Sequence, residues 1–213
     1  MKTDDLIDFL AAGDCRVESH ALARRFVPAI GLGMLAAALM MVALLGVRRD
    51  LAEAMTVPEF WVKAGFVVAL AAACLAAMPR VSRPGVPLAW ALCLVAAPPL
   101  VLWVAAAAML VDLDPAQRAA VVLGQTWKSC PFLIALLSLP PFLGILWAMR
   151  GLAPTRLRLA GALGGFLSGA LAACVYSLHC PELAAPFVAT WYLLGISIPA
   201  LAGALFGPVL LRW

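Results

Sequence analysis

Two short stretches of this sequence place a cysteine directly before a proline. They are Cys130-Pro131, which follows Lys128, and Cys180-Pro181, which follows His179, and each opens or precedes a long apolar run. Proline is favoured in the first turn of a helix, and the residue before it is held extended. The pattern therefore predicts a thiol at the N-terminus of two helices, where the helix dipole lowers a thiol pKa and favours the reactive thiolate.

Three interpretations of Cys130 and Cys180 are compatible with the sequence. They form a structural disulfide, for which the compartment outside a bacterial inner membrane is sufficiently oxidising. They form a sensing pair of accessible thiols that binds a soft metal ion or oxidises reversibly. They are unrelated residues. Geometry separates these alternatives, since a disulfide requires Cα atoms about 4.4–6.8 Å apart. Three of the other cysteines fall within apolar runs and are interpreted as small apolar side chains.

The elements that must position these thiols are membrane helices. Of the 213 residues, 65% are hydrophobic and only 12% are charged, and the mean hydropathy is +1.03. Soluble globular domains carry about 25% charged residues. Apolar runs of about 20 residues cross the hydrocarbon of a bilayer as helices. Six transmembrane helices are predicted, at about 27–46, 60–79, 87–111, 131–149, 157–177 and 185–209.

The connections between these runs differ in charge, which predicts the orientation. With the N-terminus in the cytoplasm, the inner segments hold ten Lys and Arg residues and the outer segments hold five. Basic residues concentrate in cytoplasmic segments. We therefore expect a multi-pass bacterial inner-membrane protein with both termini cytoplasmic and with Cys130 and Cys180 at the outer face. Residues 115–124, in the longest connection between two runs, predict a short interfacial helix.

The first 25 residues are polar and precede the six-helix domain predicted over 26–213. Asp4 and Asp5 suit the first turn of a short helix, and Leu6 and Leu10 share one face of it, next to Ile7. A helix this short is marginal on its own. The segment is interpreted either as a solvated tail or as a segment that folds on a partner, presenting an apolar face edged with carboxylates.

Several function classes lack the residues they need. The apolar cores of the runs contain no ionisable residue, which argues against a proton relay or a coupled ion site. Catalytic motifs such as H-E-x-x-H and G-x-S-x-G are absent from the sequence. His20 and His179 are the only histidines, so a histidine-rich metal site is excluded. Glycines four residues apart, at 161, 165 and 169 and at 203 and 207, predict close helix packing.

Taken together, the start Met1-Lys2-Thr3-Asp4-Asp5-Leu6-Ile7, the six runs and the two outer Cys-Pro sites resemble the NrsF family over the full length. Members of that family are bacterial inner-membrane anti-sigma factors with six predicted helices. The resemblance implies that residues 1–25 hold an extracytoplasmic-function sigma factor of the sigma-F type. It also implies that Cys130 and Cys180 act as a sensing pair in release under metal or oxidant stress.

The resulting hypothesis is a non-enzymatic, all-α membrane protein that sequesters a sigma factor and does not itself bind nucleic acid. Asp4, Asp5, Leu6, Ile7 and Leu10 are the expected partner-binding residues. The expected signal is a soft or heavy metal ion at Cys130 and Cys180, with His179 as an additional ligand, or an oxidant; no cofactor is expected. Release is expected to proceed by a shift of helices bent at their internal prolines. The alternatives are a quinone-dependent thiol/disulfide oxidoreductase and a small transporter.

Overall fold

The computed structural model describes residues 21–82 and 85–212, and this part of the chain is helical throughout, without strands. Asp4, Asp5, Leu6, Ile7 and Leu10 lie outside the described residues. The helices of a bundle are α2 (Ala21–Leu44), α4 (Pro58–Ser82), α5 (Ala89–Asp112), α7 (Cys130–Leu137), α8 (Leu139–Arg150), α9 (Leu157–Tyr176) and α11 (Leu193–Leu210). Short elements join them: α3 (Leu51–Ala54), α6 (Pro115–Leu123), α10 (Ala185–Phe187) and the π-helix η1 (Val188–Tyr192).

Five helical segments of the described chain are long and apolar enough to cross a membrane, and α7 with α8 make a sixth if the bent pair is one span. The predicted run 131–149 thus contains a bend of 44° between α7 and α8. The bend falls at Ser138, directly before Pro140 and Pro141. Prolines lack the backbone N–H that continues a helix and favour the first turn of a new one. The bend that these prolines predict is therefore present.

The short helix expected over 115–124 is also present, as α6. Asp114 caps it, since its carboxylate accepts from the N–H of Ala116 at 3.1 Å, and Pro115 begins the helix. Gly124 ends the helix with a φ of +56°, in the left-handed region that favours glycine. This helix carries the chain from α5 back toward α7.

Helix α9 forms the centre of the bundle and contacts α2, α4, α7, α8 and α11. Its closest neighbour is α11, because glycines of the two helices face each other as their spacing predicts. A Cβ at Gly161 or at Gly203 would collide with the backbone of the other residue, and a Cβ at Gly165 would lie 2.7 Å from the Cα of Ala200. The helices can approach this closely only because these positions lack side chains.

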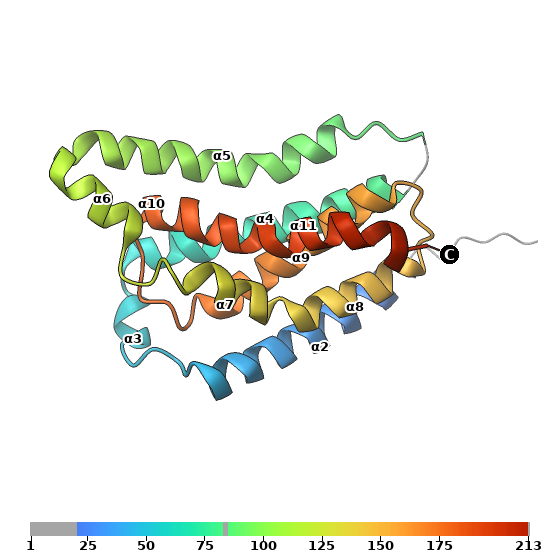
Figure 1. Ribbon diagram of the computed structural model, residues 1–213, viewed down its shortest axis with the longest axis horizontal. Coiled ribbons are helices and arrows are strands. Elements are labelled where there is room, and N and C mark those ends of the chain that lie inside the picture. Colours follow the sequence, from blue (N-terminus) through green and yellow to red (C-terminus); the bar gives the residue numbers. More distant parts are fainter. Residues whose placement is uncertain (1–20, 83–84, 213) are drawn as a thin grey trace, which may run out of the picture.

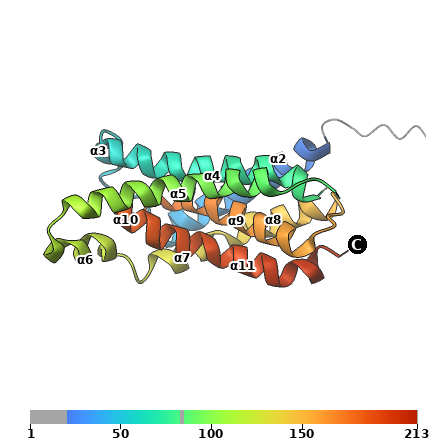
Figure 2. The same ribbon diagram turned by 90° about the horizontal axis from the view of Figure 1, so that it is seen from above.

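The connections alternate between two ends of the bundle, as Figures 1 and 2 show. The thiol end holds α3, α6, α10 and both Cys-Pro sites, and the arginine end holds the start of α2 and the end of α11. All six described carboxylates lie at the thiol end: Asp50, Glu53, Glu59, Asp112, Asp114 and Glu182. The arginine end carries seven arginines among the described residues: Arg24, Arg25, Arg80, Arg150, Arg156, Arg158 and Arg212.

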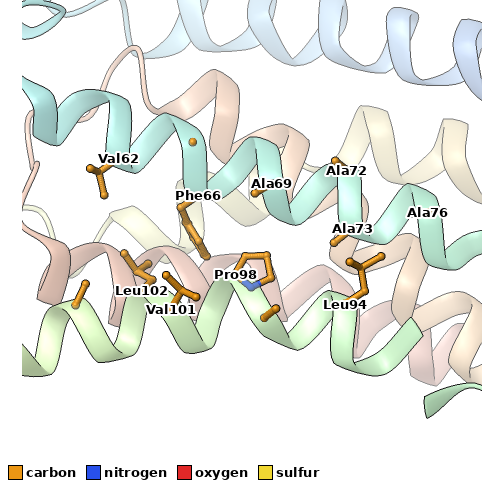
Figure 3. Close-up of a pocket in the computed structure, with 13 residues that line it drawn as sticks. Val62, Phe66, Ala69, Ala72, Ala73, Ala76, Leu94, Pro98, Val101 and Leu102 are labelled. Carbon is orange, nitrogen blue, oxygen red and sulfur yellow. The ribbon is translucent and has the colours of Figure 1, made fainter. Parts of the chain in front are cut away.

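Helix α5 stands apart from the rest of the bundle and is exposed along most of its length (Figure 1). A groove of about 750 Å³ runs between α4 and α5. Its walls are apolar, with Phe66 and Ala69 on one side and Pro98 and Leu102 on the other (Figure 3). Since no titratable or nucleophilic side chain lines this groove, the chemistry of the protein must be sought elsewhere.

We expect Gly165→Ala to destabilise the protein by about 1–3 kcal/mol, because the new methyl group overpacks the contact with α11. Gly31→Ala is the matched control, since a Cβ at Gly31 meets nothing within 4 Å. That control should be neutral or up to about 1 kcal/mol stabilising, because alanine favours helix over glycine. Thermal unfolding in detergent micelles measures both, and equal midpoints for the two variants would contradict the packing argument.

Candidate functional site

The structure brings Cys130 and Cys180 together at the thiol end, where they lie beside each other as free thiols. Cys130 begins α7, as its proline predicts. The expectation for Cys180 was wrong, because Cys180-Pro181 lies in the connection before α10, which begins only at Ala185. The N–H of Cys180 donates to the carbonyl oxygen of Tyr176 at 3.0 Å. Cys180 is therefore positioned by the end of α9 and not by the start of a helix.

The segment that leads into Cys130 is docked on the residues that follow Cys180. The N–H of Gln125 donates to Glu182 Oε1 at 2.7 Å, and Trp191 Nε1 donates to the carbonyl of Val122 at 2.9 Å. The ring of Trp191 also packs on the ring of Trp127, with centroids 5.3 Å apart. These contacts hold the start of α7 against the chain after α9, which is why cysteines fifty residues apart in the sequence meet.

Both thiols are fully buried, with 0% of each residue exposed. This corrects the expectation of accessible thiols at helix entrances. The physical reason is the docked segment after α6, which covers the pair, together with Thr126, whose hydroxyl lies 4.0 Å from the Cys180 sulfur. A reagent that reaches the sulfur atoms must therefore be small or must displace part of this cover.

Lys63, which the sequence indicates only as one of the five outer basic residues, lies beside the pair. Lys63 belongs to the second turn of α4 and is 1% exposed. Its Nζ donates to the carbonyl oxygens of Cys180 at 3.1 Å and Glu182 at 3.0 Å. It also lies over the rings of Phe60 and Tyr192, 5.9 and 5.6 Å from their centroids. Within residues 21–82 and 85–212, no carboxylate lies within ion-pair distance of this ammonium.

Two tyrosines complete the thiol cluster, which we define as Lys63, Cys130, Tyr176, Cys180 and Tyr192. The rings of Tyr176 and Tyr192 pack with centroids 5.7 Å apart. The Tyr192 hydroxyl is buried and has no partner at hydrogen-bond geometry in the described part of the chain, although it neighbours the Cys180 sulfur. It is therefore a donor available to negative charge that forms on sulfur.

The surroundings of Cys180 favour its thiolate. The hydrogen bond from Cys130 lowers the pKa of the Cys180 thiol below its ordinary value; burial opposes this shift, and the nearby Lys63 ammonium adds to it. Lys128, which lies two residues before Cys130 in the sequence, is placed over the ring of Trp127 instead. The cause of the shift is thus a second thiol and a buried ammonium, not the helix dipole that the Cys-Pro pattern suggested.

The connection after α2 reaches the same site. The N–H of Arg48 donates to the carbonyl of Leu178 at 3.2 Å, and its Nη1 donates to the carbonyl of Cys180 at 3.3 Å. The guanidinium is held by Asp50, with contacts of 2.8 and 2.6 Å, and it lowers the pKa of that carboxyl to about 2. The carbonyl oxygen of Cys180 therefore accepts from two cations on different elements.

The two sulfur atoms are the metal donors that the site offers. Among the described residues, no three His, Cys, Asp or Glu side chains cluster in a metal-binding arrangement. His179 Nδ1 lies 2.8 Å from the carbonyl oxygen of Gly46, and since a carbonyl only accepts, Nδ1 carries the proton. Thiolate sulfur selects soft metal ions, so the donor set fits the class of ion that the sequence suggested.

Sequence reasoning missed Arg48, Lys63 and the two tyrosines of the cluster. Lys63 had one usable signal, since it is a lysine inside an apolar run, and ionisable residues buried in membrane proteins usually have a functional role. It lies near the start of its run, where a lysine more often extends toward the interface. No local sequence pattern distinguishes a buried functional lysine from a lysine that extends toward the interface.

Comparisons with known proteins agree with the sequence resemblance. The sequence model of the family NrsF, described as "Negative regulator of sigma F", matches residues 10–213. The chain is 53% identical over 213 residues to "Probable anti-sigma-F factor NrsF" of Azospira oryzae. It is 41% identical over 217 residues to "Anti-sigma-F factor NrsF" of Caulobacter vibrioides. Each match covers 100% of both chains. No solved structure matches this chain.

We expect Cys130→Ala to slow alkylation of Cys180 near neutral pH, because the variant loses the hydrogen bond that lowers the pKa of Cys180. A thiol with a lowered pKa stays ionised, and therefore reactive, as the pH falls from 9 toward 7. Each unit by which the pKa rises above the working pH reduces the thiolate fraction about tenfold. Rates with N-ethylmaleimide across this pH range, resolved by peptide mass spectrometry, measure the effect.

The control is Cys93→Ala, which replaces an exposed cysteine of α5. The pH profile of Cys180 should be unchanged in this variant. A Cys130→Ala profile that coincides with that of the wild-type protein would show that Cys130 does not set the state of Cys180.

Proposed function

The chain belongs to the NrsF family of negative regulators of sigma F, and on that premise we propose that it is a membrane-bound anti-sigma factor with a thiol sensor at one end. The observation that carries the anti-sigma function is the full-length match to two anti-sigma-F factors. The names of these relatives describe regulators, which agrees with a non-enzymatic role. The partner is an extracytoplasmic-function sigma factor of the sigma-F type.

In this proposal the arginine end faces the cytoplasm and the thiol end faces the periplasm. The charge of the two ends supports this orientation, since arginine concentrates at one end and all six described carboxylates lie at the other. It gives a six-pass topology in the inner membrane with both termini cytoplasmic. The thiol pair then lies in an oxidising compartment, and metal ions and oxidants from outside the cell reach it before they reach the cytoplasm.

Residues 1–25 form the sigma-binding segment of the proposal. They precede or begin α2 at the arginine end, on the side where the sigma factor resides. Leu6, Ile7 and Leu10 supply the apolar contact, and Asp4 and Asp5 supply charges at its edge. A segment of this length orders on its partner, so its affinity is adjustable by small changes at the point where it joins the bundle.

The sensing step uses the Cys130–Cys180 pair. With a peroxide as oxidant, the two thiols lose two electrons and two protons to form a disulfide, and the peroxide O–O bond breaks to give an alcohol and water. With a soft divalent metal ion, the two thiols lose two protons and form two sulfur–metal bonds. Both reactions replace the present contact between two free thiols with covalent or metal–sulfur bonds of fixed length. Either reaction changes the packing of the thiol end.

Release requires only a modest free-energy change. A tenfold loss of affinity for the sigma factor corresponds to about 1.4 kcal/mol. Hydrogen bonds to charged groups, such as those of Lys63 and Arg48 to the Cys180 carbonyl, contribute about 1.5–3 kcal/mol each. Perturbing one such bond is therefore enough if it is coupled to the sigma-binding segment.

We expect Leu6→Asp combined with Ile7→Asp to reduce the membrane-retained sigma factor about tenfold or more, because carboxylates are costly to bury in an apolar interface. Ser19→Asp with His20→Asp adds the same number of carboxylates to a polar part of the segment and is the control. Fractionation of membranes followed by quantitative immunoblotting measures retention. Undiminished retention by the Leu6/Ile7 variant would contradict a binding role for this segment.

We expect Cys130→Ser combined with Cys180→Ser to retain the sigma factor and to lose its release by cadmium or peroxide, because neither reaction can occur without the sulfur atoms. Cys93→Ser, at an exposed position of α5, should respond as the wild-type protein does. A reporter of sigma-dependent transcription measures release. Normal induction in the double variant would refute the sensing role of the pair.

A further inference from the structure

We propose that Arg48 and Lys63 are positioning residues that lock the connection carrying Cys180 to the ends of α2 and α4, and that sulfur chemistry acts on the sigma-binding segment by releasing this lock. The inference rests on the proposed function, since it supplies the link between the thiol pair and residues 1–25. It assigns to α2 the coupling that the sequence-based hypothesis gives to helices bent at their internal prolines. The clamp is defined as Gly46, Arg48 and Lys63 with the residues 178–182 that they contact.

The first half of the clamp joins the connection 178–182 to the end of α2. Arg48 donates to the carbonyls of Leu178 and Cys180, and His179 Nδ1 donates to the carbonyl of Gly46 at 2.8 Å. These bonds alternate in direction between the two segments. Either segment can therefore move away from the other only by breaking several hydrogen bonds together.

No flexible linker separates this half of the clamp from α2. The N–H of Gly46 donates to the carbonyl of Met41 at 2.9 Å, and Gly46 adopts a φ of +77°. This is a glycine cap that terminates a helix with a defined backbone. His179 thus holds the carbonyl of the capping residue itself, so a displacement of the connection reaches the last turn of α2 directly.

The second half of the clamp is the ammonium of Lys63, which is buried and donates to the carbonyls of Cys180 and Glu182. These bonds lie on either side of Pro181 and fix the path of the chain through the Cys-Pro site. The N–H of Cys180 is bonded to Tyr176 as well. The backbone of Cys180 is therefore held on both sides of its side chain.

Because hydrogen bonds fix the backbone of Cys180, a displacement of its sulfur atom strains those hydrogen bonds. The sulfur atoms of a disulfide lie about 2.05 Å apart, which is closer than two free thiols, as Cys130 and Cys180 are here, can lie. A bridging metal ion requires its own fixed sulfur positions. Either reaction pulls Cys180 relative to Lys63 and Arg48, and hydrogen bonds weaken steeply when their geometry is lost.

Helix α2 is suited to respond to this loss. It lies at the edge of the bundle against α8, and one face of it is exposed, including Leu32, Leu35 and Leu39 (Figure 1). Its arginine end continues directly into the proposed sigma-binding segment. Opening the clamp frees the thiol end of α2, and the movement reaches Ala21, where α2 begins.

The test compares Arg48→Gln and Lys63→Met with Arg49→Gln, which removes the same charge from the exposed neighbour of Arg48. Sigma factor in the membrane and soluble fractions is measured without stimulus, with equal amounts of each variant in the membrane. We expect the two clamp variants to release at least fivefold more sigma factor than Arg49→Gln. Retention equal to that of Arg49→Gln would overturn the proposal.

A second experiment tests whether the clamp acts downstream of the cysteines. Each clamp variant is combined with Cys130→Ser and Cys180→Ser, and the unstimulated release should persist, because an open clamp no longer needs sulfur chemistry. Release that disappears in the cysteine-free background would overturn the proposal. A merely structural defect would not give this result, since it would lower the amount of protein in the membrane.

Failure of the proposed function and failure of the clamp proposal give different results. If the wild-type chain does not retain the sigma factor, or if the double serine variant is still inducible, the proposed function fails whatever the clamp variants do. A clamp variant whose membrane level falls is replaced by Arg48→Lys, which keeps the charge and loses the guanidinium fork. Arg48→Lys should give unstimulated release above that of Arg49→Gln, and wild-type retention by it would overturn the proposal.

Discussion

The buried ammonium of Lys63 is the constraint on which the thiol end depends. A charge removed from water must be compensated, and for a side chain as buried as this one the compensation has to come from the protein itself. Here it comes from two carbonyl oxygens, two aromatic faces and a cysteine whose thiolate is favoured. Because the carbonyls belong to Cys180 and Glu182, the connection after α9 must fold over α4, and Cys180 is carried to its position beside Cys130.

Burial of the thiol pair follows from the same arrangement. The segment between α6 and α7 docks on the chain after Cys180 through Gln125 and Trp127, and this docking seals the cluster. A sealed pair reacts with few reagents, and in the sensor proposed above this would exclude most other thiol chemistry. The groove between α4 and α5 is lined by apolar residues and contains no member of the thiol cluster.

Local patterns predicted the helical segments well. Run length located the long helices, and Pro140-Pro141 located the bend. The four-residue spacing of glycines, which includes Gly161 in one helix and Gly203 in another, located the closest helix contact. Patterns failed where the structure depends on residues distant in the sequence. Cys180-Pro181 looks like Cys130-Pro131, yet Lys63 and Arg48 hold Cys180 outside any helix. The π-helix of residues 188–192 has no recognisable signal in the sequence.

The close approach of α2 and α8 has a mechanical consequence. A Cβ at Gly33 would collide with the backbone of Pro141, so these two residues form a tight point of contact near the middle of α2. From Gly33 to either end of the helix is roughly 17–18 Å at 1.5 Å per residue. If α2 pivoted on this contact, its two arms would be of nearly equal length, so a displacement of one end would move the other end in the opposite direction by a similar amount.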